Sequence, residues 1–203
     1  MAAFFCADLH LGHRNIHSYR PKPDGTAFLT PEEHDKFLVE RWMEMRLKNR
    51  RDTVYVLGDI AFTDDAWDLF DSLPGKKIII LGNHCTESAG SIQKIASLKS
   101  VNSVHAALSY KGYWLTHIPM HPAELRGKRN IHGHMHAGYI RDRRFKCVSL
   151  EHTEMRPINL EEITAEFERR QSIKYVQETL GWQAAAKALM LGATGNTRKP
   201  SIT

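Results

Sequence analysis

The sequence contains few cysteines and no motif that would pair them. Only Cys6, Cys85 and Cys147 occur in 203 residues, and no two of them form a C-x-x-C pair. An odd number of thiols without that spacing argues against a disulfide framework and against a zinc ribbon. We therefore expect all three thiols to be reduced.

Long apolar stretches are also missing. The apolar runs are far shorter than the ~20 residues that cross a bilayer, and the start Met1-Ala-Ala-Phe-Phe-Cys6 lacks a basic signal-peptide region. A hydrophobic content of 42% still allows a sizeable core. These features predict a cytoplasmic protein with no membrane partner. They also predict a single domain over residues 1–191 and a disordered polar tail at 192–203.

A compact basic patch is the third absence. The net charge of +5 favours an anionic partner, but no Lys/Arg cluster interleaved with aromatic residues is present. Nucleic acid is therefore less well supported as a partner than a phosphate-ester substrate such as a nucleotide. Twelve histidines, several of them beside glycines, are the stronger departure from ordinary composition.

Apolar runs alternate with helix signals along the chain, and this alternation predicts an α/β fold. Thr30-Pro31-Glu32-Glu33 has the pattern of a helix start with a capping box, while Asp64 or Asp65 and Asn159 are expected to cap later helices. The expected strands are 3–7, 54–57, 78–81, a hairpin formed by 101–108 and 113–116, and strand-like pieces at 139–140 and 145–150. The expected helices are 31–45, 64–72, 88–99, one that begins near 160, and 182–191.

Polar residues follow the apolar runs at the points where these end. Gly82-Asn83-His84, for example, comes directly after the Ile/Leu run 78–81. Because open α/β sheets carry their sites at the carboxyl ends of strands, we expect these polar groups to converge. The full set of candidate metal ligands is Asp8, His10, Asp59, Asn83, His117, His134 and His136. Seven ligands are too many for one ion and fit two, with the carboxylate of Asp59 as the bridge.

The order and spacing of these residues carry a family resemblance. The set Asp8-x-His10, Gly58-Asp59, Gly82-Asn83-His84, His117 and Gly133-His134-x-His136, within residues 3–155, resembles the signature of the calcineurin-like metallophosphoesterase superfamily. The run after Asp8 is similar to small bacterial and phage members. The resemblance implies an αββα sandwich of two packed mixed sheets flanked by helices, with a dinuclear metal site at the carboxyl ends of the strands. A phage-encoded member would act in the host cytoplasm.

The resemblance also implies a division of labour among the ligands. Asp8, His10, Asp59 and His136 would hold one divalent transition-metal ion, and Asp59, Asn83, His117 and His134 the other. We expect Mn²⁺, with Fe, Ni²⁺ or Zn²⁺ as the alternatives, because the ligands are oxygen and imidazole. In the implied reaction a hydroxide that bridges the metals attacks phosphorus, and His84 protonates the leaving group as general acid.

Departures from the family pattern narrow the substrate. The Gly58-Asp59 turn continues as Ile60-Ala61-Phe62-Thr63-Asp64 and lacks the aspartate and arginine of the phosphoprotein phosphatases. Histidine at position 84 differs from the arginine of the UDP-diacylglucosamine pyrophosphatases. Cys85 stands where most members carry Asp or Glu, which leaves open how the loop is supported. We therefore expect a phosphodiesterase rather than a protein phosphatase.

Other polar residues lie beside the motifs, and other functions stay open. His13, Arg14, Arg20 and His121 are candidate substrate contacts, and His132 is a candidate support for the ligands. A metal-dependent nuclease or phosphomonoesterase is the alternative enzyme. A non-catalytic metal-binding scaffold on the same fold is the alternative of a different class.

Overall fold

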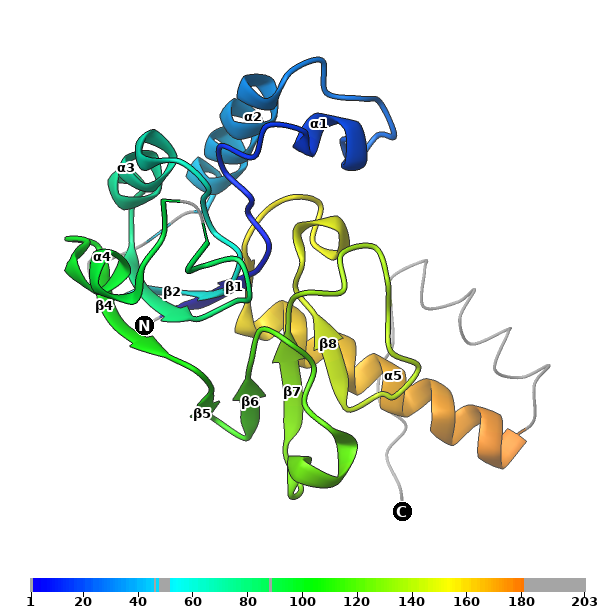
Figure 1. Ribbon diagram of the computed structural model, residues 1–203. Helices are drawn as coiled ribbons and strands as arrows, with labels where there is room; N and C mark the ends of the chain where they lie inside the picture. Colours follow the sequence, from blue (N-terminus) through cyan, green and yellow to red (C-terminus); the bar gives the residue numbers. More distant parts are fainter. Residues whose placement is uncertain (1, 46, 48–51, 88, 181–203) are drawn as a thin grey trace. The chain divides into compact units, whose positions relative to one another are not determined.

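The computed structural model describes residues 2–45, 47, 52–87 and 89–180 (Figure 1). The chain divides into two compact units, Met1–Leu160 and Glu161–Thr203, and each is described by itself. Within the described residues, every helix is too short or too polar to span a bilayer. The expected helix 182–191 and the expected tail 192–203 lie outside the described residues.

The first sheet of the larger unit has five strands in the order β4-β3-β2-β1-β9. The strands are β1 (Ala3–Cys6), β2 (Thr53–Leu57), β3 (Lys76–Ile80), β4 (Val101–His105) and β9 (Ile158–Asn159). The first four run parallel, whereas β9 pairs antiparallel with β1 at the edge. Four adjacent parallel strands therefore end together at one edge of this sheet.

The second sheet has four strands in the order β5-β6-β7-β8. The strands are β5 (Leu108–Tyr110), β6 (Tyr113–Leu115), β7 (Arg129–His132) and β8 (Phe145–Cys147). β5 and β6 form the expected hairpin, in which Lys111 and Gly112 both have positive φ, as a tight two-residue turn requires. The expected long partner 101–108 is wrong, because residues 101–105 pair with β3 in the first sheet.

Helices occupy the connections between strands. They are α1 (Ile16–Tyr19), α2 (Pro31–Met43), α3 (Asp64–Ser72), α4 (Ile92–Ser97), the 3₁₀ turns η1 (Pro122–Leu125) and η2 (Leu150–His152), and α5 (Leu160–Leu180). Thr30 caps α2 as predicted, with its side chain accepting a hydrogen bond from the Glu33 N–H. The helix predicted over 64–72 is confirmed as α3, but its predicted cap, Asp64 or Asp65, is wrong: Thr63 is the cap and accepts from the Ala66 N–H.

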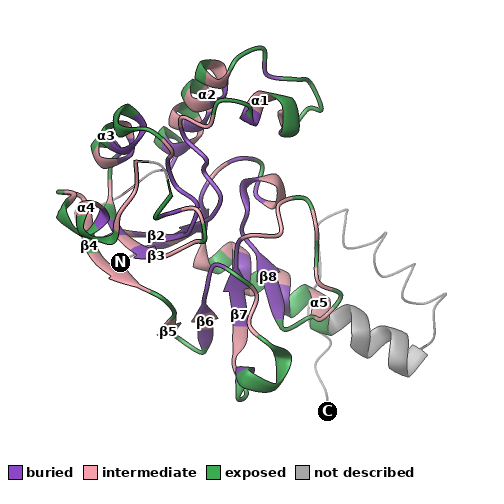
Figure 2. Ribbon diagram, viewed as in Figure 1, coloured by how far each residue is buried: buried purple, intermediate pink, exposed green. Residues whose placement is uncertain are grey.

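One face of the first sheet packs against α2, α3 and α4 (Figure 1). Fully buried strand residues such as Val56 and Ile79 meet Trp42 of α2 and Trp67 and Phe70 of α3. Burying each such side chain contributes about 1.5–3 kcal/mol of transfer free energy. Figure 2 shows this purple interior between the helices and the strands, with the outer helix surfaces exposed.

The other face of the first sheet meets the second sheet through aromatic rings. Phe5 and Tyr55 stack with their ring centroids 5.0 Å apart, and Tyr110 of β5 lies 4.8 Å from the Tyr55 ring. An isolated bridge between Ala7 and Ser149 joins the segments that follow β1 and β8. The larger unit is thus α/β with two mixed sheets and flanking helices, and the residues that follow strands of both sheets come together.

Three expected elements differ from the structure. Residues 139–140 form no strand, because the Gly138 N–H bonds back to the Met135 carbonyl in a turn. The strand expected over 145–150 ends at Cys147 and the chain then enters η2. The helix expected over 88–99 is shorter, since Ser91 caps α4 and Leu98 is already extended.

In the smaller unit the first turn of α5 carries Glu161 and Glu162, which suit the positive end of the helix dipole. Arg170 and Glu166 form an ion pair one turn apart. Asn159, the expected cap of this helix, is the last residue of β9.

Candidate metal centre

All seven candidate ligands follow the carboxyl ends of strands. Asp8 and His10 come after β1, Asp59 after β2, Asn83 after β3, His117 after β6, and His134 and His136 after β7. β1, β2 and β3 are parallel neighbours, and so are β6 and β7. The expected convergence is confirmed, because the seven residues gather into two side-chain clusters instead of lying scattered along the sheet edges.

The backbone at these ligands is in an unusual conformation. Within the described residues nine non-glycine residues have positive φ, and five of them are Asp8, His10, Asp59, His134 and His136. The left-handed region costs an L-residue on the order of 1 kcal/mol each. Strain gathered on the ligand positions indicates that the surrounding fold fixes where these side chains point.

Two glycines allow the ligand loops to approach one another. Gly82 lies against Asp59, and a Cβ at this position would collide with the Asp59 Oδ1. Gly58 has a φ of +88°, and a Cβ there would collide with the His117 ring. Glycine is therefore required at both positions if Asp59 and His117 are to meet.

Cluster one consists of Asp8, His10 and His136, each offering one ligand atom within 4.8 Å of the others. The His10 Nε2 lies 4.0 Å from the Asp8 Oδ1, and both atoms are buried without a hydrogen-bond partner. The other carboxylate oxygen of Asp8 accepts bonds from the His134 N–H at 2.9 Å and from the Ser149 hydroxyl at 2.5 Å. Asp8 is thus held by one oxygen and presents the other.

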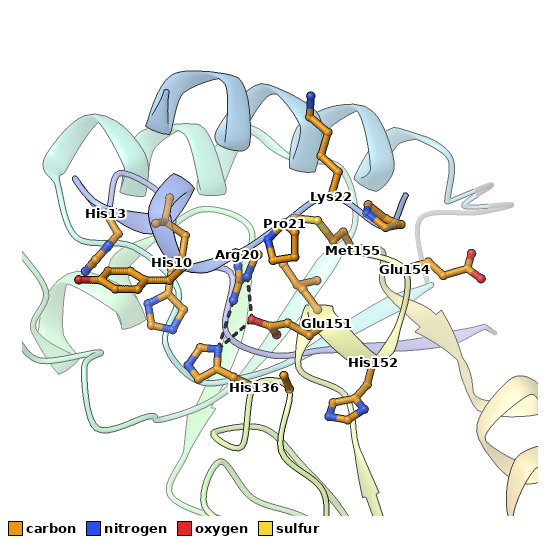
Figure 3. A pocket seen from close by; sticks show the side chains of 15 residues that line it. His10, His13, Arg20, Pro21, Lys22, His136, Glu151, His152, Glu154 and Met155 are labelled. Carbon is orange, nitrogen blue, oxygen red and sulfur yellow. Dashed lines mark hydrogen bonds and ion pairs between the residues drawn. The ribbon is translucent and has the colours of Figure 1, made fainter. Parts of the chain in front are cut away.

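A buried ion pair supports His136 from behind. Glu151 Oε1 accepts hydrogen bonds from the His136 Nδ1 at 3.0 Å and from the Arg20 Nε at 2.9 Å, as the dashed lines in Figure 3 show. Because Nδ1 of His136 carries the proton for this bond, Nε2 is left as the coordinating nitrogen. Ligand and carboxylate together form the arrangement that orients metal-binding histidines in proteins.

Cluster two consists of Asp59, His117 and His134, with Asn83 beside them. The His117 Nε2 lies 2.9 Å from the Asn83 Oδ1, 3.2 Å from the Asp59 Oδ2 and 3.2 Å from the His134 Nδ1. The other nitrogen, Nδ1, donates to the Leu57 carbonyl at 2.8 Å, so Nε2 is the nitrogen that faces the other ligand atoms.

The donor sets of both clusters fit a cation. In cluster two, oxygen and nitrogen lone pairs converge around the His117 Nε2, and one N–H could satisfy only one of them. In cluster one, two buried ligand atoms lack any partner. Unsatisfied buried polar atoms are costly, and a divalent ion would satisfy them together. Carboxylate, amide and imidazole ligands without thiolate favour Mn²⁺, Fe, Ni²⁺ or Zn²⁺.

The pKa values of the ligand groups shift in different directions when no ion is bound. Burial lowers the pKa of His10 to about 3, and the Arg20 charge acts in the same direction, so His10 is neutral. Burial raises the pKa of Asp8 above its ordinary value despite the Ser149 hydrogen bond. Burial also opposes ionisation of Asp59, but the hydrogen bond and charge of His117 outweigh it, and the pKa of Asp59 is lowered.

The pair behind cluster one is strongly ionic. The hydrogen bond to Glu151 raises the pKa of His136 although burial opposes this. Burial alone would raise the pKa of Glu151, but His136 and the Arg20 charge lower it to about 2. Glu151 is therefore an anion throughout the physiological pH range.

His84 lies between the two clusters. Its backbone N–H donates to the Asp59 Oδ1 at 2.9 Å, and its ring centroid is 6.1 Å from that of His10 and 5.8 Å from that of Phe62. The Nδ1 bonds to the Glu87 Oε2 at 2.6 Å. The His84 side chain is 39% exposed, so part of the ring is open to solvent.

The candidate substrate residues separate into different environments. His13 contacts Phe62 edge-on with ring centroids 4.9 Å apart, and Arg14 is exposed on the same loop. His121 is exposed and caps η1 by accepting from the Ala123 N–H. His132 is buried in β7, where its Nδ1 bonds to the Gly133 carbonyl at 2.9 Å. His132 belongs to neither ligand cluster.

Arg20 does not fit the expected role of a phosphate clamp. Its side chain is 1% exposed. Nε bonds Glu151, Nη1 contacts the Leu9 carbonyl and His34, and Nη2 contacts the Asp8 carbonyl and His136. The bonds to Glu151 and to the Leu9 and Asp8 carbonyls already use a donor on each of the three guanidinium nitrogens. The residue instead holds the loop after β1 and neutralises Glu151.

The sequence interpretation missed three polar residues of the site. Ser149 bonds Asp8, Glu151 bonds His136, and Glu87 bonds His84. Ser149 and Glu151 do follow the same signal as the ligands, since they come at the end of the apolar run 145–150. Glu87 is three residues beyond His84 in a loop without periodicity, and no pattern indicated it.

Comparisons with known proteins bear on the fold alone. No family model matches the chain, and no curated protein matches it. A crystal structure of a protein of unknown function from Aquifex aeolicus is similar, with a TM-score of 0.56 and 22% identity. The match covers 81% of this chain and 98% of that one. It shows that two chains of low identity share this arrangement of strands and helices.

Proposed function

We propose that the chain is a metal-dependent phosphoesterase of the calcineurin-like metallophosphoesterase type, and that it hydrolyses a phosphodiester. The observation that carries the proposal is the pair of ligand clusters at the strand ends, with His84 beside both of them. The αββα sandwich with a dinuclear site is part of this proposal, and the two mixed sheets are compatible with it.

In this proposal Asp8, His10, Asp59 and His136 hold one ion, and Asp59, Asn83, His117 and His134 hold the second. Asp59 is grouped with cluster two in the structure, and its role as a bridge belongs to the proposal. Divalent ions held there would supply Lewis acidity toward the phosphoryl oxygens and toward an attacking water. Mn²⁺ is the proposed metal, with Fe, Ni²⁺ or Zn²⁺ as alternatives.

His84 is the proposed general acid. Hydrolysis forms a bond from a water oxygen to phosphorus and breaks the bond to one ester oxygen, which then requires a proton. His84 would give that proton from Nε2, while its Nδ1–H stays bonded to Glu87 and stabilises the ring orientation. The Asp59 carboxylate fixes the backbone of the same loop through the His84 N–H.

A metal-replacement assay tests the function. Protein stripped of metal and refilled with Mn²⁺ is expected to hydrolyse bis-p-nitrophenyl phosphate faster than p-nitrophenyl phosphate, and the stripped protein should be inactive. Protein that binds two equivalents of Mn²⁺, Fe²⁺, Ni²⁺ or Zn²⁺ yet turns over neither ester would contradict the enzyme and favour a scaffold. Faster turnover of the monoester would contradict the preference for diesters.

A further inference from the structure

A cavity of about 710 Å³ opens beside cluster one. Its two walls are the segment from Ile16 to Pro23 on one side and residues around η2 on the other, and His10, His13 and His136 line the end at the metal ligands. Figure 3 shows the cavity extending from His10 and His136, past Arg20 and Glu151, toward His152 and Glu154. Small-molecule sites commonly measure about 300–1,000 Å³, so the space is large enough for an organic group.

The charged residues around the cavity are paired with protein partners. Arg20 is bound to Glu151, Lys22 lies 2.6 Å from Glu33, and the Glu154 carbonyl and carboxylate face Arg41. A second phosphate in the cavity would therefore find no uncompensated cation among the residues that line it. The rest of the wall is largely apolar or aromatic and includes Ile16, Tyr19, Pro21, Leu150 and Met155.

Tyr19 gives this wall a ring that a ligand can use. The residue lines the cavity and is 75% exposed, so its ring is not packed into the hydrophobic core. An exposed aromatic ring beside an apolar wall stacks well on flat, uncharged rings.

His84 is not among the residues that line the cavity. If His84 protonates the departing oxygen, the cavity is left for the substituent that stays on phosphorus. This step rests on the proposed function.

We infer that the cavity beside cluster one binds the retained substituent of a phosphodiester, and that this substituent is an uncharged ring-bearing group of nucleoside size. The substrate class is then a nucleoside phosphodiester rather than a polyphosphate or a dialkyl ester. The phosphate itself sits at the metal ligands, and the sugar and base extend along the wall formed by α1 and η2.

Two chromogenic diesters with the same leaving group measure how much the retained substituent contributes to turnover. Thymidine 5′-(p-nitrophenyl) phosphate carries the nucleoside, whereas methyl p-nitrophenyl phosphate carries only a methyl group. With the Mn²⁺-loaded protein we expect kcat/KM to be about tenfold or more higher for the nucleoside ester, as base stacking on an aromatic ring predicts. Tyr19→Ala should remove most of this advantage and leave the methyl ester within about twofold.

Further variants and a binding measurement keep the test sharp. Ala137→Trp should fill the cavity and abolish the nucleoside preference, while Tyr139→Ala, an exposed aromatic residue that does not line the cavity, should change nothing. Calorimetric titration of the metal-free proteins with thymidine 5′-methyl phosphate should give similar affinities for the wild type and Tyr139→Ala. It should give weaker binding for Tyr19→Ala and for Ala137→Trp.

The outcomes distinguish this inference from the proposed function. Equal rates for the two esters, with no response to Tyr19→Ala, would overturn the cavity assignment and leave the phosphodiesterase intact. Absence of turnover together with Tyr19-dependent binding of the thymidine diester would overturn the function and support the cavity. Absence of both turnover and binding would overturn both.

Discussion

Cluster one and cluster two differ in how completely the fold assembles them. In cluster two the His117 Nε2 already lies within 2.9–3.2 Å of the Asn83, Asp59 and His134 ligand atoms. In cluster one the His10 Nε2 lies 4.0 Å from the Asp8 Oδ1, and these two facing atoms have no hydrogen-bond partner. Cluster two is thus preorganised, whereas cluster one has room left between its ligands.

The supports behind the two clusters differ in the same way. His117 is fixed by a backbone carbonyl, that of Leu57, which a side-chain substitution cannot remove. His136 is fixed by Glu151, whose own position depends on the buried Arg20. Preorganised ligands lose less entropy on binding, so an ion should bind more tightly at cluster two. Cluster one, which opens onto the cavity, has the more adjustable ligands.

The largest effect is expected from Asp59→Asn, which tests whether the two clusters are separate. The replacement removes the carboxylate charge that faces the His117 Nε2. If Asp59 bridges the two ions, it also weakens the binding of both. We expect both metal equivalents to bind more weakly and kcat to fall by about a thousandfold or more. Metal content after dialysis and steady-state rates measure this. The matched control is Asp142→Asn, an aspartate paired with Arg144 on an exposed loop.

Loss of only one equivalent in Asp59→Asn would mean that the clusters bind their ions independently. That result would contradict the bridge and sharpen the contrast between the two sites.

His84→Ala should have a large effect on rate and none on metal binding. The His84 ring supplies no ligand atom to either cluster, so the variant should still bind two equivalents of metal. We expect a loss of about 10²–10⁴-fold for esters with poor leaving groups and a much smaller loss for p-nitrophenyl esters. His105→Ala is the control, because that histidine bonds Ser103 in β4. An equal loss for good and poor leaving groups would remove His84 from the acid role.

The sequence predicts the ligands better than it predicts what supports them. Each ligand follows an apolar run, and parallel strands must bring such ends together, so Asp8, Asp59 and Asn83 could be grouped without coordinates. The pairing of His136 with cluster one and of His134 with cluster two came only from the family resemblance. Glu87 and the role of Arg20 depend on loop conformations that have no periodicity, and therefore they could not be predicted.

The same limit explains the errors in the fold. The expected strands 3–7, 54–57 and 78–81 are apolar runs and α2 has a Thr-Pro-Glu-Glu cap, and these elements are present in the structure. The segment 101–108 reads as a continuous strand, yet its first part pairs with β3 and its end joins the other sheet. Which sheet a strand joins is decided by tertiary packing that a single sequence pattern does not encode.

Glu151→Gln should weaken metal binding at cluster one without changing metal binding at cluster two. The amide keeps its shape but gives up the charge that orients His136 and neutralises Arg20, so the ion at cluster one should bind about 10–100-fold more weakly. The ion at cluster two should be unaffected, and the two phases of a metal titration should move further apart. Thermal unfolding of the metal-free variant must be followed too, since Arg20 loses a buried partner.

Glu154→Gln is the matched control for Glu151→Gln, because the Glu154 side chain is 75% exposed. Equal loss of metal affinity at both clusters would mean that the Arg20–Glu151 ion pair supports the whole site. It would contradict the proposed difference between the clusters.

The smallest effect is expected from Glu87→Gln, which acts on His84 without touching either cluster. The bond from the His84 Nδ1 to the Glu87 Oε2 is short, at 2.6 Å, but the two side chains are 39% and 55% exposed, so water and salt screen the charge. Glutamine keeps an acceptor for Nδ1–H and removes only the charge. We therefore expect kcat for poor leaving groups to fall about two- to fivefold, with KM and both metal affinities unchanged. Glu87→Ala, which removes the acceptor as well, should cost more, and Glu87→Asp should recover part of the rate. A change in metal affinity in any of these variants would place Glu87 with the ligands of cluster two through the Asn83-His84 loop, and not with the acid alone.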